Sequence, residues 1–212
     1  DIQSRHRGGT TLEQGEETMD AGTDTVPRAW WERLGTLPVA AAVLVGLNGL
    51  YMVLVAFGNI TDFDTNQAFV QHVLAMDTTN FGAEPGTNLD PDVMWRAIES
   101  EWLQDAAYIG IIAWETVTSL ILLGSLVFWL RDSESGYRRA RALSTIGLLM
   151  LVLLFMGGFI AIGGEWFQMW KSQAWNGLDP AFRNASLGIA ALVVVHLPSS
   201  HWQPKGRNVA DA

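Results

Sequence analysis

Residues Leu143 to Ile162 read LSTIGLLMLVLLFMGGFIAI, an almost unbroken apolar run, and residues Gly163 to Gly177 follow it as GGEWFQMWKSQAWNG. The first stretch has the roughly 20-residue length of a helix that crosses the hydrocarbon core of a bilayer. The second crowds three tryptophans around one glutamate. Tryptophan has an apolar ring and one N–H, so it settles where hydrocarbon meets water. The two stretches therefore indicate a membrane-spanning helix and the rim that follows it.

Three further apolar stretches have the same character. Residues 37–57 and 106–130 each reach spanning length, and residues 184–197 do so when their helix begins near Pro180. Apolar runs of this length are rare in soluble folds. The sequence therefore predicts an all-α protein, a bundle of four transmembrane helices within one membrane domain, residues 28–202. The spans are expected at about 37–57, 106–130, 143–162 and 180–197.

The charges of the joining segments predict the topology. Segment 58–105 carries nine acidic residues against the lone cation Arg96, whereas Arg131, Arg138, Arg139 and Arg141 follow the second span. Cytoplasmic loops are enriched in Lys and Arg. We therefore expect both termini to be cytoplasmic, and segments 58–105 and 163–179 to form a helical cap on the extracytoplasmic side.

The two ends of the chain are expected to lie outside the membrane domain. Residues 1–27 are polar and aperiodic, which favours disorder, and residues 203–212 form a short C-terminal tail. Met19 is a plausible natural start of translation. Residues 1–18 are therefore interpreted as a translated leader.

Several classes of site are excluded by the sequence. It has no cysteine, so it forms no disulfide and no thiolate-ligated metal centre. A b-type haem usually needs histidines inside the spans, and His196 lies only near a span end; no span carries the lysine that retinal needs. No phosphate loop, dinucleotide fingerprint or zincin motif occurs, and the charge pattern is not that of a nucleic-acid surface. We therefore expect no cofactor and no nucleic-acid partner, but contact with bound membrane lipid.

Glu115 is the candidate functional residue inside the membrane. It lies near the middle of the second span, where a carboxylate is costly unless it is paired, protonated or hydrated. No Lys or Arg lies within any span, and Asn48 of the first span could donate a hydrogen bond to it. Glu115 and Asn48 therefore form one candidate site. The structural alternative is a Glu that joins two helices by a hydrogen bond.

A second set of candidates lies in the predicted cap: Asp62, Asp64, His72, Asp77, Arg96, Glu165 and Arg183. The four carboxylates and the histidine could converge as a metal site, although turn capping accounts for the same residues. We expect Glu165 to contact Arg96 or Arg183 and so to fasten the cap. No catalytic residue and no metal ligand set is assigned.

Aromatic residues are predicted to anchor the protein at the two membrane interfaces. Tryptophan gathers at that depth because its ring is apolar and its N–H needs a partner. The predicted anchors are Trp30, Trp31, Trp95, Trp102, Trp129, Trp166, Trp170 and Trp175.

Three segments resemble the signatures of one family. Asn59 to Asp77, read as NITDFDTN followed by FVQHVLAMD, looks like the first, and Trp95-Arg96-Ala97-Ile98 is similar to the second. Gly163 to Gly177, followed by Ala181-Phe182-Arg183, looks like the third. The family is the bacterial predicted small integral membrane proteins, DUF2165, a domain of unknown function. The resemblance covers about Leu37 to Leu197 and implies four membrane helices, with no activity assigned.

Three functions follow as hypotheses. The first is a non-catalytic accessory or structural subunit of a larger membrane protein complex in the bacterial inner membrane, because four helices rich in small residues offer packing surfaces. These helices are expected to leave little room for a solvent pathway in a monomer. The alternative is a small transporter or ion- or proton-handling protein that uses Glu115. The second alternative is a membrane enzyme or metal-binding protein that uses the outer acidic residues and His72.

Overall fold

A computed structural model describes residues 29–205, and every regular element in this part of the chain is helical. Four segments are long and apolar enough to cross a membrane. They are α2 (Leu37–Thr61), α4 (Glu101–Arg131), α5 (Arg138–Val152) continued by the π-helix η3 (Leu153–Trp166), and α6 (Leu178–His196). The predicted four-helix architecture is confirmed. The interpreted leader, residues 1–18, lies outside the described residues.

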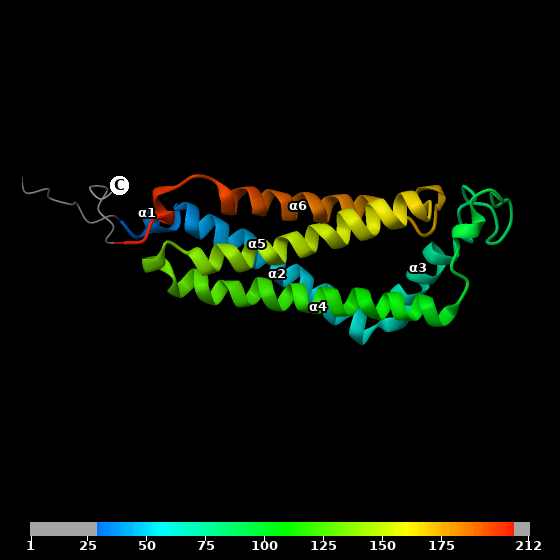
Figure 1. Ribbon diagram of the computed structural model, residues 1–212, viewed down its shortest axis with the longest axis horizontal. Helices are drawn as coiled ribbons and strands as arrows, with labels where there is room; N and C mark the ends of the chain where they lie inside the picture. The colour runs from blue at the N-terminus through cyan, green and yellow to red at the C-terminus, as the bar shows by residue number, and fades with distance from the viewer. Residues whose placement is uncertain (1–28, 206–212) are drawn as a thin grey trace, which may run out of the picture.

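The four segments form a bundle in which α2 and α5 each contact both α4 and α6 (Figure 1). Glycines allow the close approach. A Cβ added to Gly147 of α5 would lie 2.6 Å from Leu122 Cδ2 of α4, and one added to Gly188 of α6 would lie 2.6 Å from Leu151 Cδ2. Lipid tails are as apolar as leucine, so membrane helices associate through such close van der Waals contact.

Apolar side chains close the half of the bundle nearest to the chain ends. Val45, Leu148 and Val195 are fully buried there. Trp129 is also buried, and its Nε1 donates to Ser144 Oγ at 2.9 Å. Trp129 is therefore part of the bundle interior, which differs from its predicted place as an interface anchor.

Short elements gather at the two ends of the bundle (Figure 1). One end carries α1 (Trp30–Leu34), η2 (Ser133–Ser135) and η5 (Ser200–Trp202); we call it the terminal end. The other end carries α3 (Phe63–Ala75), η1 (Met94–Arg96) and η4 (Met169–Lys171). We call residues 62–100 and 167–177 the cap.

The helix α4 extends beyond α2 at the cap end. It begins at Glu101, five residues before the predicted span, and α3 packs against it. Asp105 Oδ1 of α4 accepts hydrogen bonds from Gln67 Nε2 and Gln71 Nε2 of α3 at 2.7 and 3.3 Å. The helix α3 starts at Phe63, directly after the chain leaves α2. Polar pairs between α3 and α4 thus mark where α4 leaves the apolar part of the bundle.

The two cap segments are joined to each other by hydrogen bonds and a small apolar core. Phe81 N donates to Lys171 O at 3.1 Å, and the hydroxyls of Thr78 and Ser172 lie 2.9 Å apart. Val73, Met76, Phe167 and Met169 form the buried apolar cluster beneath them. The stretch Gly163 to Gly177 is therefore held against the segment that follows α3.

Candidate functional site

Glu115 and Asn59 form a buried hydrogen bond between α4 and α2. Asn59 Nδ2 donates to Glu115 Oε2 at 2.7 Å, and Glu115 is 2% exposed. Asn48, the partner expected from the sequence, donates instead to Leu44 O of its own helix at 2.9 Å. That prediction is wrong because Asn48 lies three turns away from Asn59 along α2. The carboxylate is thus linked to Asn59, which sequence reasoning placed in the external loop.

The position of Asn59 also fixes the depth of Glu115. Glu115 lies about 21 Å from the start of α4 at 1.5 Å per residue. Asn59 lies only about 3 Å from the end of α2 at Thr61. Since the two side chains touch, Glu115 lies close to the cap end of α2. It lies near the middle of α4, as the sequence predicted, but toward the cap end of the bundle because α4 extends beyond α2 there.

Further polar groups surround this pair. Asn66 Nδ2 of α3 donates to Asn59 Oδ1 at 2.7 Å, which continues the chain of hydrogen bonds into the cap. Tyr108 of α4 is 1% exposed, and its buried hydroxyl has no hydrogen-bond partner in residues 29–205. A buried hydroxyl without a partner costs free energy, so such groups are rare and call for an explanation.

These residues line a cavity of about 530 Å³ beneath the cap. Its walls come from α2, α3, α4, η3 and the start of α6. Asn66, Ala174 and Asn176 on its rim are exposed, whereas Glu115 and Tyr108 are buried. The cavity therefore opens at the cap and has Glu115 in its interior.

A second polar pair lies on the wall formed by α6. Asn184 Nδ2 donates to Tyr51 Oη of α2 at 2.6 Å, and both residues line the cavity. Asn184 is buried, and Tyr51 is partly exposed on the bundle surface. The polar residues of the cavity thus come from α2, α3, α4 and α6, which no single segment of sequence contains.

The predicted outer metal site is not assembled in the described part of the chain. His72 Nδ1 lies 2.8 Å from Asp77 Oδ2, and the His72 ring stacks on Trp175 at 4.6 Å. Asp62 accepts a hydrogen bond from Thr65 Oγ1, and no group of three or more His, Cys, Asp or Glu side chains is placed to hold a metal ion between residues 29 and 205. Asp64 is exposed on the first turn of α3. Of these candidates the structure brings together only His72 and Asp77.

The predicted contact between Glu165 and an arginine is also not formed. Arg96 Nη1 donates to Trp166 O at 3.3 Å, and its guanidinium lies over the rings of Trp95 and Trp166. Within residues 29–205 the ion pairs are His72–Asp77 and Lys171–Asp90. Glu165 and Arg183 are exposed. Arg96 does fasten the cap, but through a backbone carbonyl and two aromatic faces.

The tryptophans predicted as anchors divide into three groups. Six are exposed: Trp30, Trp31, Trp95, Trp102, Trp166 and Trp170. Trp129 is buried in the bundle, as described above. Trp175 is half-buried and lines the cavity, where it contacts His72 and Phe69. Trp175 is therefore a wall of the candidate site.

The polar residues of the cavity that sequence reasoning missed include Asn59, Asn66, Tyr108 and Asn184. Only Asn184 carried a usable signal, since it is a polar residue inside the apolar stretch of the fourth span. Asn59 and Asn66 lie among many polar residues of the loop. Their role depends on the helical continuation of α2 to Thr61 and on the fold of α3 back onto it.

Comparison with known proteins gives one match. The model of a family described as predicted small integral membrane protein (DUF2165) matches residues 37–198. No curated protein and no solved structure matches the chain. The matched residues include all four long helical segments and the whole cavity.

Proposed function

This chain belongs to the DUF2165 family of predicted small integral membrane proteins, and from that premise we propose that it is an ion-handling protein of the bacterial cytoplasmic membrane. In this proposal Glu115 binds a small cation that enters the cavity from the cap side. The cap is extracytoplasmic and both termini are cytoplasmic, as the arginines near the terminal end favour.

The burial of Glu115 with no Lys or Arg paired to it in residues 29–205 carries the proposal. A carboxylate taken out of water costs several kcal/mol unless an opposite charge or several hydrogen bonds offset it. Within the described residues Glu115 accepts one hydrogen bond, from Asn59, and forms no ion pair. Because Glu115 lines a cavity that opens at the cap, a cation can reach it and supply the missing charge.

The sequence led us to expect little room for a solvent pathway in the bundle, but the cavity provides space at the cap end. About 530 Å³ is far more than one water molecule needs. Beyond Glu115, Met52, Leu122 and Leu151 close the bundle toward the terminal end. This arrangement supports binding from one side. Passage across the membrane would require a second state in which that apolar half opens.

Thermal unfolding of the full chain in phosphatidylcholine nanodiscs tests this proposal. Methylammonium chloride should raise the melting temperature relative to sodium chloride at equal ionic strength, because a ligand that binds only the folded state stabilises it by mass action. Glu115→Gln should abolish the difference, and Asn48→Ala should keep it. An equal response of the wild type and Glu115→Gln would exclude Glu115 as the cation site.

An accessory-subunit role is the second candidate, and one face of α4 favours it. Ala106, Gly110, Ala113 and Gly124 are exposed at helical spacing, and a Cβ on Gly110 or Gly124 would meet nothing within 4 Å. Small residues on a membrane helix let a second helix pack closely. Lipid covers this face when no partner is bound.

Cysteine cross-linking in native membranes tests the second candidate, since the chain has no cysteine of its own. Gly110→Cys should form a discrete cross-linked species with a partner subunit, while Ile109→Cys, exposed on a neighbouring face of α4, should not. Equal cross-linking at both positions would indicate random collision and remove the support for a packing face.

A further inference from the structure

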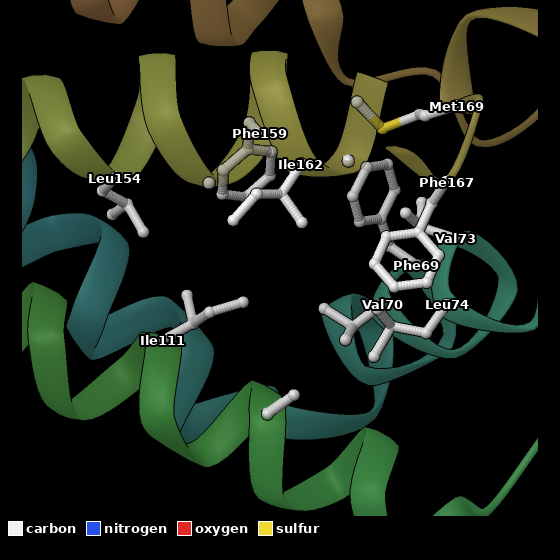
Figure 2. Close-up of a pocket in the computed structure, with 13 residues that line it drawn as sticks. Phe69, Val70, Val73, Leu74, Ile111, Leu154, Phe159, Ile162, Phe167 and Met169 are labelled. Carbon is white, nitrogen blue, oxygen red and sulfur yellow. The ribbon is translucent and has the colours of Figure 1, made fainter. Parts of the chain in front are cut away.

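A second, apolar pocket of about 210 Å³ lies beside the Glu115 cavity. Figure 2 shows its side chains facing one another across a space between η3, α4 and α3. Leu154 and Ile162 come from η3, Val73 and Leu74 from α3, and Phe167 from the cap. None of these side chains carries a polar group. The pocket therefore suits an apolar group and gives water no partner.

The two spaces share walls. Phe69, Val70, Ile111 and Phe159 line both. Ile111 lies one helical turn before Glu115 on α4, so the apolar pocket begins about 6 Å from the position of the carboxylate along that helix. The stacked rings of Phe69 and Phe159, with centroids 6.3 Å apart, stand at the boundary. A single molecule can thus contact Glu115 and extend past these rings into the pocket.

We propose that the two spaces form one site for an amphipathic amine, with the ammonium group at Glu115 and an alkyl chain in the pocket between η3, α4 and α3. The inference rests on the proposed cation site and names the class of ligand. The Tyr108 hydroxyl, which has no hydrogen-bond partner among residues 29–205, lines the same cavity as Glu115, and in this proposal it accepts a second N–H of the ammonium group. An ammonium group has three donors and so can use both.

The charges of the cavity distinguish this ligand from a phospholipid. No Lys or Arg lines the cavity or the apolar pocket among residues 29–205, so neither offers a positively charged partner to a phosphate group. The ligand is therefore a phosphate-free, single-chain amine. A cavity of about 150 Å³ accepts benzene, which has six carbons. In proportion, the pocket of about 210 Å³ has room for roughly eight carbons.

Affinities of n-alkylammonium ions for the full chain in phosphatidylcholine nanodiscs test the inference. Affinity should rise roughly fourfold per added methylene, the ratio that about 0.8 kcal/mol corresponds to, and level off near eight carbons. The matching 1-alkanols should bind much more weakly because they lack the charge. Tyr108→Phe should weaken binding of the ammonium series by a similar factor at every chain length. An affinity independent of chain length would overturn the inference.

Two adjacent glycines provide a matched pair of variants. Gly158 lines the pocket, and a Cβ there would meet only Leu154 Cδ1, at 3.9 Å, so Gly158→Leu fills the pocket. Gly157 does not line it, and a Cβ there would meet nothing within 4 Å. Gly158→Leu should remove the gain with chain length and leave methylammonium binding unchanged. Gly157→Leu should behave as the wild type. The same loss in both variants would overturn the assignment of the alkyl chain to this pocket.

The proposed function and this inference fail in different ways. If methylammonium does not bind, the cation site itself is absent; if it binds but octylammonium binds no better, only the two-part site is wrong. Should Gly158→Leu not fold, an octylammonium ion with a terminal diazirine replaces it. Its adducts should fall on buried pocket residues such as Val73 and Phe167, and adducts only on exposed bundle residues would overturn the inference. Competition by added phosphatidylethanolamine would overturn the assignment to a phosphate-free amine.

Discussion

At the scale of single residues, the decisive contact is the hydrogen bond from Asn59 to Glu115. It joins two helices, satisfies one oxygen of a buried carboxylate, and leaves the other without a protein donor in the described residues. Asn59 is itself held by Asn66 of α3. Such a chain of amides fixes the direction in which the carboxylate points, which a solitary acid in an apolar bundle could not achieve.

Replacing Asn59 by alanine should destabilise the protein by about 1–2 kcal/mol, because Glu115 then loses its donor while remaining buried. Asn48→Ala is the control. Among the described residues its amide bonds only to the carbonyl of Leu44 in the same helix, and its loss should cost less than about 0.5 kcal/mol. Equilibrium unfolding in mixed micelles measures both. Equal effects of the two substitutions would contradict the assigned importance of the Asn59–Glu115 contact.

At the scale of elements, the cap depends on how two loop segments meet. Gln173 Nε2 donates to Phe81 O at 2.7 Å, next to Gly82, which has a φ of +95°. A Cβ on Gly82 would lie 2.5 Å from Gln173 Oε1. The joint between the segments therefore needs glycine both for its backbone angle and for space.

Gly82→Ala should loosen the cap more than Gly86→Ala does. Both positions have positive φ, so both substitutions carry backbone strain of about 1–2 kcal/mol. Only at Gly82 must Gln173 also move and lose its bond to Phe81 O, since nothing lies within 4 Å of a Cβ on Gly86. Hydrogen exchange of the Phe81 amide, which donates to Lys171 O, reports the difference. Equal exchange in the two variants would show that Gln173 contributes nothing to the joint.

The turn between α4 and α5 should lose stability in acid. Neighbouring groups hold the pKa of Asp132 below its ordinary value. The Ser135 side chain has the largest effect, and the backbone N–H of Arg139 adds to it by donating to Asp132 Oδ2 at 2.9 Å. Because the pKa is lower in the folded than in the unfolded state, the stabilisation is complete above the unfolded pKa. It is lost as pH falls through the folded pKa.

Asp132→Ala provides the measurement of this effect. The difference in thermal stability between wild type and Asp132→Ala should be constant at neutral pH and shrink once the pH falls below the usual range of an Asp carboxyl. Glu134→Ala, at an exposed position in the same turn, should show no such trend. A difference that grows toward low pH would contradict the assigned role of Asp132.

At the scale of the whole molecule, charge is divided between the two ends of the bundle. Asp77, Glu84, Asp90 and Asp92 lie in the cap, whereas Arg131, Arg138 and Arg139 lie at or beside the α4–α5 turn at the terminal end. The cavity opens at the acidic end. Acidic residues at this end of the bundle raise the local concentration of cations there, which fits a cationic ligand.

Single cysteines should reveal the orientation of the bundle. Thr87→Cys in the exposed part of the cap should react with a membrane-impermeant maleimide on intact cells, and Ser133→Cys near the terminal end should react only after lysis. The wild-type chain is the control for background, because it has no cysteine. The reverse pattern would place the cap in the cytoplasm and contradict the prediction from the arginines.

The sequence by itself determined the class and the helices of this protein. Apolar runs of about 20 residues have few alternatives to spanning a bilayer, so the four helices, their approximate ends and the family could be recognised. It also singled out Glu115, since an acid in an apolar run is conspicuous wherever the helix lies. These conclusions rest on composition within one segment at a time.

Only the tertiary structure decided which polar groups meet. Whether Asn48 or Asn59 reaches Glu115 depends on how α2 and α4 are shifted along each other, and neither helix encodes that shift alone. In the same way, Arg96 contacts the Trp166 carbonyl and the rings of Trp95 and Trp166, and not the predicted partner Glu165. The fold of α3 against α4 created the cavity and its apolar extension. Such contacts follow from the relative register of packed elements, a property of their joint packing that periodicity in a single segment does not contain.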